Sequence, residues 1–197
     1  MRAGRSLVLR FCRDMFVDGQ PPTIQASCLE RALRIGDKKV NLVIWDTAGQ
    51  ERFHALGPIY YRDADAALLV YDITDTDSFK RIQLWVRELR KMVGSEIQLT
   101  IAGNKLDLER QRVVSKQEAA EYAESVGALY SETSAKLGKG IEEVFTSLGK
   151  RLLQARASKR GAGASGAGSG RGRGSSMVLI EDEAGSSGSG GKSSGCC

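Results

Sequence analysis

The sequence has no apolar run that approaches the roughly 20 residues of a membrane-spanning helix, and no N-terminal run long enough for a signal peptide. Cysteine is also scarce. Cys12 and Cys28 stand alone and Cys196 and Cys197 are the last two residues, so the cysteines form no disulfide framework. These absences predict a protein that is made and kept in the cytosol unless lipid carries it to a membrane.

Aromatic residues are absent from residues 159–197, a segment of 39 residues that holds 12 of the 23 glycines. A segment of this composition cannot bury a hydrophobic core, so we predict a flexible tail without regular structure. The whole chain of 197 residues is 41% hydrophobic and 27% charged, as in ordinary globular proteins. We therefore predict one folded domain over residues 1–158.

Basic charge is too sparse to indicate nucleic-acid binding. The net charge of +5 divides into +3 for residues 1–158, with 24 basic and 21 acidic side chains, and +2 for the tail, with 5 and 3. The sequence therefore predicts no nucleic-acid partner.

Hydrophobic patterns of period 2 and period 3.6 alternate after residue 27, which predicts an α/β fold with a mostly parallel sheet and flanking helices. The segment Gly36-Asp37-Lys38 predicts a hairpin turn. Continuous apolar runs predict two buried central strands, at 66–71 and 97–102. The other predicted strands are 28–35, 39–46 and 129–130, and the predicted helices are 78–93, 115–126 and 141–157.

One apolar island, Met177-Val178-Leu179-Ile180, interrupts the Gly, Ser and Ala background of the tail and precedes Glu181-Asp182-Glu183. We predict a flexible linker here, not structure. Two interpretations of the island stand side by side: a chance cluster, or a short docking segment for the groove of a partner.

Asp46-Thr47-Ala48-Gly49-Gln50 follows the predicted strand that ends at Trp45. In an open α/β sheet, ligands bind at the carboxyl ends of the strands. The carboxylate of Asp46 can hold Mg²⁺ through water, the N–H of Gly49 can approach a terminal phosphate, and Gln50 can orient an attacking water. Taken alone, these residues are also compatible with an ordinary strand-ending turn.

Asn104-Lys105-Leu106-Asp107 follows the buried run that ends at Ala102-Gly103. The carboxylate of Asp107 can accept hydrogen bonds from N1–H and the exocyclic amine of guanine, a donor pair that adenine lacks. Lys105 can lay its methylenes along the plane of the base. A single Asn-Lys-x-Asp is also compatible with a solvated polar turn.

Thr133-Ser134-Ala135-Lys136 comes after the short strand at 129–130, where a backbone N–H such as that of Ala135 could reach the guanine carbonyl. Three such loops follow strands in this order, separated by 58 residues (46 to 104) and then 30 (104 to 134). Their combination makes coincidence improbable, and together they favour a guanine-nucleotide site.

With these motifs the chain resembles the Rab family of small GTPases from residue 7 to about residue 153, and again in Cys196-Cys197. Segments 22–27 and 54–58 are most similar to the early-endosomal Rab subgroup, and further similar segments are 41–45, 52–57, 60–62 and 69–74. The resemblance implies a Ras-like P-loop NTPase fold and a GTP-binding switch that hydrolyses GTP to GDP. It also implies regulation of vesicle traffic at the cytoplasmic face of endosomal membranes, with cycling through the cytosol.

The resemblance also implies roles for single residues. Thr23, the only threonine of the expected first switch, would bind Mg²⁺ and sense the γ-phosphate, and Gln50 would position water for hydrolysis. Cys196 and Cys197 would each carry a geranylgeranyl chain, and the apolar island of the tail could dock on escort proteins. The implied partners are exchange factors, GTPase-activating proteins, effectors, an escort protein and a GDP-dissociation inhibitor.

The chain has no match to G-x-x-x-x-G-K-[ST], the loop that cradles phosphates in P-loop NTPases. The resemblance begins inside the helix that should follow this loop, so we expect the first strand of the sheet to be missing as well. That strand is central in Ras-like sheets, between the strands at 40–45 and 66–71. Its loss would leave two apolar edges unpaired and remove about ten ladder hydrogen bonds at ~0.5–1.5 kcal/mol each.

Two functional hypotheses follow. The preferred one is a truncated version of a working GTPase, because the guanine motifs, Gln50 and the cysteine pair are intact. The alternative is a short isoform or fragment that holds nucleotide poorly and acts only as a prenylated interaction protein.

Overall fold

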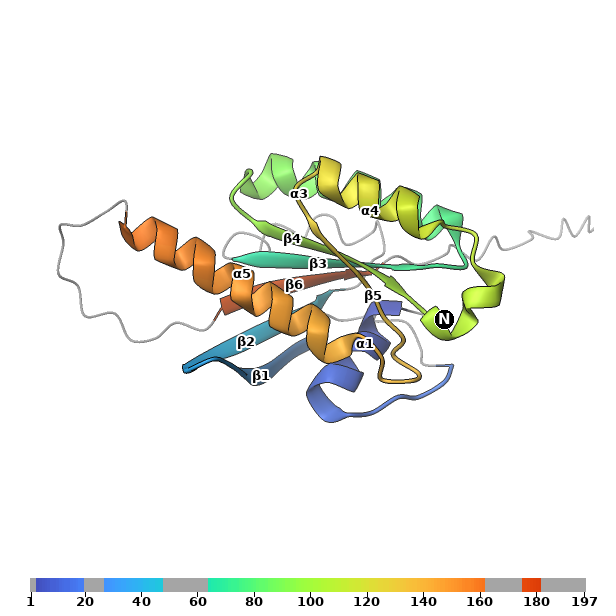
Figure 1. Ribbon diagram of the computed structural model, residues 1–197, viewed down its shortest axis with the longest axis horizontal. Coiled ribbons are helices and arrows are strands. Elements are labelled where there is room, and N and C mark those ends of the chain that lie inside the picture. The colour runs from blue at the N-terminus through green and yellow to red at the C-terminus, as the bar shows by residue number, and fades with distance from the viewer. Residues whose placement is uncertain (1–2, 20–26, 48–63, 162–174, 182–197) are drawn as a thin grey trace, which may run out of the picture.

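The computed structural model describes residues 3–19, 27–47, 64–161 and 175–181, and within these ranges the chain forms a six-stranded sheet with two helices on each face (Figure 1). The strands are β1 Ser27–Ile35, β2 Lys38–Thr47, β3 Ala66–Asp72, β4 Gln98–Asn104, β5 Leu129–Glu132 and β6 Ser175–Glu181. The helices are α1 Ala3–Arg13, α3 Thr76–Val93, α4 Lys116–Ser125 and α5 Ile141–Gly161, with the 3₁₀ helix η2 Leu106–Gln111. The predicted α/β fold is confirmed.

The strand order is β1-β2-β6-β3-β4-β5. β1 and β2 form the predicted antiparallel hairpin, with Ile35 opposite Lys38, and every other neighbouring pair is parallel. Gly36 turns the hairpin at a φ of +58°, a left-handed conformation that glycine adopts without steric cost.

Both faces of the central strand β3 are covered by helices. Its residues alternate between the two hydrophobic clusters of the domain: Leu68 and Val70 pack on the side of α1 and α5, whereas Leu69 and Tyr71 pack on the side of α3 and α4. Both sets are almost completely buried. A strand in this position must be apolar throughout, which is the pattern of the sequence.

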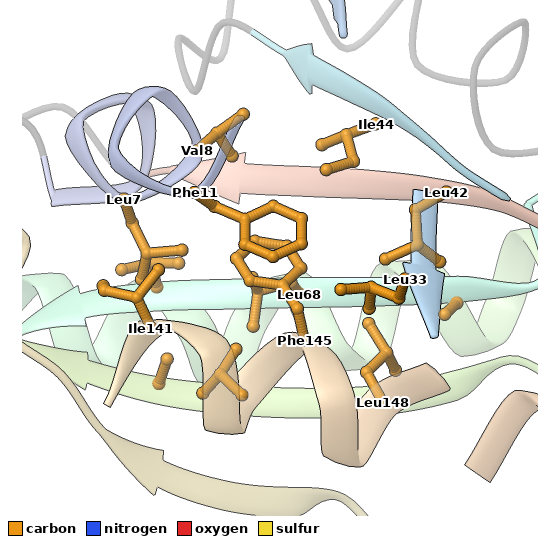
Figure 2. Close-up of a cluster of buried hydrophobic side chains, with 14 of the residues drawn as sticks. Leu7, Val8, Phe11, Leu33, Leu42, Ile44, Leu68, Ile141, Phe145 and Leu148 are labelled. Carbon is orange, nitrogen blue, oxygen red and sulfur yellow. The ribbon is translucent and has the colours of Figure 1, made fainter. Parts of the chain in front are cut away.

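The cluster on the α1 side joins the N-terminal helix to the rest of the domain (Figure 2). The ring of Phe11 from α1 stacks on the ring of Phe145 from α5, with centroids 3.7 Å apart and planes 10° apart. Leu7 and Val8 are buried beside them. The guanidinium of Arg31 lies 4.2 Å from the centroid of Phe11, so β1 also contacts this cluster.

The helix starts follow from capping side chains. Asp75 accepts hydrogen bonds from the N–H groups of Asp77 and Ser78 at the start of α3, and Ser115 accepts one from the N–H of Glu118 at the start of α4. The predicted helices at 78–93, 115–126 and 141–157 are confirmed, with α5 continuing to Gly161.

The prediction of a tail without regular structure is wrong for Ser175–Glu181, which forms β6. This strand lies between β2 and β3 and runs parallel to both. The two edges that we expected to be unpaired are therefore paired with the tail, in the place where the first strand was expected. The physical reason is local: four consecutive apolar residues without Gly or Pro can form a central strand, although the average composition of the tail disfavours structure.

Two further expectations concern membranes and thiols. Among the residues that the structure describes, no helix is long and apolar enough to cross a membrane. Cys12 and Cys28 are both free thiols, in agreement with the absence of a disulfide framework. Residues 162–174 and 182–197, with Cys196 and Cys197, lie outside the described residues.

Candidate functional site

The parallel strands bring their carboxyl ends to one edge of the sheet, and the polar motifs of the sequence lie there. Asp46 is next to the last residue of β2, Asn104 ends β4, and Ser134 comes two residues after β5. Thr23, Gly49 and Gln50 lie outside the described residues.

Asn104 joins the second and third motifs. Its buried side-chain oxygen accepts hydrogen bonds from the hydroxyl of Thr133 and from the N–H of Ala135, each at 3.1 Å. The backbones are joined as well, since the N–H of Leu106 donates to the carbonyl of Thr133 at 3.0 Å. Two loops that are 29 residues apart in sequence are thus joined by three hydrogen bonds.

Asp107 is oriented by Ser134. The Ser134 hydroxyl donates to one carboxylate oxygen of Asp107 at 2.5 Å and accepts a hydrogen bond from the N–H of Leu137 at 3.1 Å. Ser134 itself is fully buried. The position of the Asp107 carboxylate is therefore set by a residue of the third motif.

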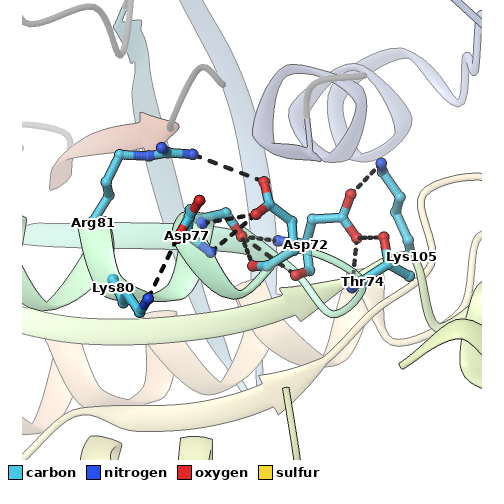
Figure 3. Close-up of polar contacts among 8 residues, drawn as sticks. Asp72, Thr74, Asp77, Lys80, Arg81 and Lys105 are labelled. Carbon is cyan, nitrogen blue, oxygen red and sulfur yellow. Dashed lines mark hydrogen bonds and ion pairs between the residues drawn. The ribbon is translucent and has the colours of Figure 1, made fainter. Parts of the chain in front are cut away.

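Lys105 has a left-handed backbone, with a φ of +70°. Its ammonium group pairs with the carboxylate of Asp72 at the end of β3 (Figure 3). The other oxygen of Asp72 accepts hydrogen bonds from the N–H and hydroxyl of Thr74, at 2.9 and 2.7 Å. Asp72 and Thr74 thus hold the charged end of Lys105, a support that the motif alone did not indicate.

A cavity of about 170 Å³ opens between these motifs and the segment that follows α1. Five predicted site residues line it, together with residues that were not predicted. Its lining consists of Ser6, Phe16, Val17, Asp18, Gly19, Asn104, Lys105, Asp107, Leu108, Ala135 and Lys136. The apolar pair Phe16-Val17, which follows the amphipathic helix α1 after two intervening residues, was the available signal for the part that was not predicted.

Arg10 connects α1 to the third motif and was also missed. Its guanidinium donates to the carbonyls of Ala135 at 2.9 Å and Lys136 at 3.0 Å. Both partners are backbone oxygens 125 or more residues away, so no pairing of charges in the sequence could have indicated them.

Asp46 lies in a different environment. Its side chain is almost fully buried, one oxygen lies 3.4 Å from the hydroxyl of Ser27, and the same oxygen lies 3.7 Å from the guanidinium of Arg5. Arg5 is one-third exposed. A cation from α1 therefore faces the carboxylate that the sequence assigned to Mg²⁺.

The chemistry of Asp46 is compatible with a magnesium site. Mg²⁺ in phosphate sites takes one or two protein oxygen ligands and completes its shell with phosphates and waters. Among the described residues no group of three or more His, Cys, Asp and Glu side chains could hold a metal by itself. Asp46 supplies a suitable oxygen, and a metal ion there would share it with Arg5.

The strands beneath the guanine motifs are held by a polar network. The hydroxyls of Tyr71 and Tyr130 are 3.1 Å apart, and Tyr130 donates to Glu132 at 3.1 Å. Burial, with the contact to Tyr130, raises the pKa of Tyr71 far above its ordinary value. Arg112 pairs with Glu132 at 2.7 Å and with Glu109, and its hydrogen bond lowers the pKa of Glu109.

Comparison with known proteins identifies the family of the chain. The Ras family model matches residues 3–154. Rab-21 from Canis lupus familiaris is 58% identical over 98% of this chain and 85% of its own length, and human Rab-21 is 56% identical over 98% and 84%. Rab-5A from Dictyostelium discoideum is 47% identical over 80% of this chain and 78% of its own length.

The chain belongs to the Ras family of GTP-binding proteins. Within that family it is a Rab small GTPase of the early-endosomal kind, and its role lies in endosomal membrane traffic. Ras-family proteins generally bind GTP or GDP with Mg²⁺ and work with regulators and effectors.

Proposed function

We propose that this chain is a guanine-nucleotide switch whose cavity at the carboxyl edge of the sheet takes the guanine base of GTP or GDP. The observation that supports this best is the convergence of Asn104, Lys105, Asp107 and Ala135 around one cavity, although they come from two separate loops. A cavity with a few oriented polar groups is typical of small-ligand sites.

In this proposal Asp107 selects guanine. Its carboxylate would accept hydrogen bonds from N1–H and the exocyclic amine, while the Ser134 hydroxyl keeps it in position. Lys105, anchored through Asp72, would present its methylenes to the base, and Lys136 lines the same cavity. The N–H of Ala135 donates to Asn104, so a guanine carbonyl would have to share that donor.

We assign the phosphate end of the nucleotide to the edge beyond β2. Thr23 would bind Mg²⁺, Asp46 would hold the ion through water, and the N–H of Gly49 would approach the γ-phosphate. When bound, Mg²⁺ neutralises charge that develops on the phosphate oxygens. Gln50 would orient the water that attacks in hydrolysis, with a GTPase-activating protein accelerating the reaction.

The test is a titration of the full chain with fluorescent GDP, followed by displacement with unlabelled nucleotides. GTP and GDP should displace the probe at concentrations about 10²-fold lower than ATP and ADP, because adenine leaves the Asp107 carboxylate without its donor pair. Equal displacement by adenine nucleotides would contradict the proposal.

A second function, a nucleotide-deficient protein that acts only through its prenylated tail and its protein contacts, is favoured by one observation. The sequence has no match to G-x-x-x-x-G-K-[ST]. We expect the chain to bind GDP at least about 10²-fold more weakly than a variant with this loop restored, a loss of at least ~2.8 kcal/mol. Equal affinity would contradict the importance of the loop, and no measurable binding by the chain would favour the second function.

Membrane attachment through Cys196 and Cys197 belongs to either function. Two geranylgeranyl chains would give stable anchoring on endosomal membranes, and escort and GDP-dissociation-inhibitor proteins would handle the lipidated form. Mass spectrometry of the C-terminal peptide from cells should show a prenyl adduct on both cysteines. An unmodified peptide would reject this part of the proposal.

A further inference from the structure

The centre of the sheet contains a slot between β2 and β3 that the tail strand β6 fills. In β2, residues 42–47 pair with 175–180, and in β3, residues 66–70 pair with 177–181. β2 is paired on its other side with β1, and β3 with β4. Without β6, each of these strands would therefore have one edge paired with its other neighbour. The backbone N–H and C=O groups along its second edge would be unpaired in the middle of the sheet.

The segment that fills the slot is the part of the tail whose residues are suited to a central strand. Met177-Val178-Leu179-Ile180 is the only run of four apolar residues within 159–197, and neither glycine nor proline occurs in Ser175–Glu181. Glycine-rich sequence flanks this run on both sides. A central parallel strand requires an apolar segment in which every residue can donate its N–H.

The connection allows the same molecule to supply the strand. α5 ends at Gly161 and β6 begins at Ser175, and both ends lie on the same side of the domain in Figure 1. The 13 intervening residues, 162–174, can reach up to about 45 Å when extended. Six of these residues are glycine.

We propose that Ser175–Glu181 is an intramolecular ligand of the slot between β2 and β3, so that sheet completion and capture of this tail segment by a partner exclude each other. A partner that binds the segment as an extended chain, through an apolar groove or an open sheet edge, must use the same backbone groups. Its binding would empty the slot and expose the edges of β2 and β3. The proposal does not depend on nucleotide binding.

The exchange also changes the reach of the lipidated end. With β6 in place, 16 residues, 182–197, follow the sheet, which corresponds to at most about 55 Å. With β6 released, 36 residues follow Gly161, at most about 125 Å. Insertion of the strand would therefore shorten the maximum reach of Cys196 and Cys197 from the folded domain by more than half.

Hydrogen exchange on the unaltered full chain tests the proposal directly. Amides of 175–181 should exchange at least about 10²-fold more slowly than the same amides in a synthetic peptide of residues 173–183. Sedimentation of the same sample should show a monomer. Exchange at the rate of the peptide, or protection found only in a dimer that swaps the strand, would overturn it.

A full-chain variant links this protection to the sheet. Leu179→Pro removes a backbone donor within β6, and it should raise the exchange rates of residues 42–47 and 66–70 by about tenfold or more. Ala167→Pro, in the linker, is the matched control and should leave them unchanged. Adding the 173–183 peptide to Leu179→Pro should restore the protection. Equal exchange in all three proteins would reject the proposal, and if Leu179→Pro fails to fold, the measurement on the unaltered chain decides.

Discussion

The two ends of the candidate site are held in different ways. The base end is defined by Asn104, Lys105, Asp107, Ser134 and Ala135, and the Asp46 end by Arg5, Ser27 and Asp46. At the base end, the loops after neighbouring strands β4 and β5 hydrogen-bond to each other through buried groups. At the Asp46 end, a carboxylate meets a partly exposed arginine from a separate helix at 3.7 Å.

This difference predicts different effects of substitution at the two ends. Buried, mutually satisfied hydrogen bonds fix geometry, and losing one partner costs free energy of unfolding. Because Arg5 is one-third exposed, water can screen its ion pair with the buried Asp46 carboxylate, so this pair contributes less to stability than the buried hydrogen bonds of the base end. We therefore expect substitutions at the base end to destabilise the domain, and substitutions at the Asp46 end to change its response to cations.

The largest effect is expected for Asn104→Ala. The substitution leaves the Thr133 hydroxyl and the Ala135 N–H without their acceptor in the interior, and should lower the free energy of unfolding by about 2–4 kcal/mol. Urea denaturation measures it. Asn41→Ala, at an exposed asparagine of β2, is the control and should stay within ~0.5 kcal/mol of the parent. Similar losses in both variants would contradict a special role for the base end.

Gly103→Ala should come next. A Cβ atom at this position would lie 2.7 Å from the hydroxyl oxygen and 2.9 Å from the Cζ of Tyr71, so the buried Tyr71 side chain or the strand that carries it would have to shift. Overpacking of this kind costs ~1–3 kcal/mol in thermal or urea unfolding. Tyr71→Phe combined with Gly103→Ala removes the closer of the two contacts and should recover part of the loss. If the double variant is no more stable than Gly103→Ala, the contact with the Tyr71 hydroxyl is not the cause of the loss.

These predictions rest on features that the sequence analysis reached only in part. The apolar runs and the order of the three motifs predicted the central strands and the closeness of Asn104 to Ser134, because parallel strands end at one edge. Arg10 and Arg5 were not predicted, since their partners are distant in sequence and α1 carries basic residues at several positions. β6 was not predicted because the average composition of residues 159–197 disfavours structure, although the four apolar residues 177–180 are enough to form a strand.

Arg10→Ala should have a smaller effect on stability. It removes two hydrogen bonds from α1 to the carbonyls of Ala135 and Lys136, which corresponds to about 1–2 kcal/mol. Because these bonds position the third motif, the dissociation rate of fluorescent GDP should rise. Arg13→Ala, at an exposed residue of the same helix, is the control. An equal dissociation rate in the two variants would show that the contacts of Arg10 do not affect nucleotide binding at the base end.

The smallest effect on stability is expected for Arg5→Ala, at ~1 kcal/mol or less, because Arg5 is one-third exposed and water can take its place beside Asp46. The variant should instead respond more strongly to Mg²⁺, since the metal no longer shares the Asp46 oxygen with a guanidinium. The ratio of GDP affinities measured with Mg²⁺ and with EDTA should therefore rise relative to the parent and to Arg13→Ala. An unchanged ratio would show that Arg5 does not compete at Asp46.

The most direct test of guanine selection at the base end is the preference for GDP over xanthosine diphosphate in the full chain and in Asp107→Asn. Asparagine offers a donor where aspartate offers only acceptors, and xanthine carries a carbonyl in place of the exocyclic amine of guanine. The ratio of the two dissociation constants should shift toward xanthine by about 10²-fold or more. An unchanged ratio would contradict the assignment of Asp107 and with it the proposed orientation of the base.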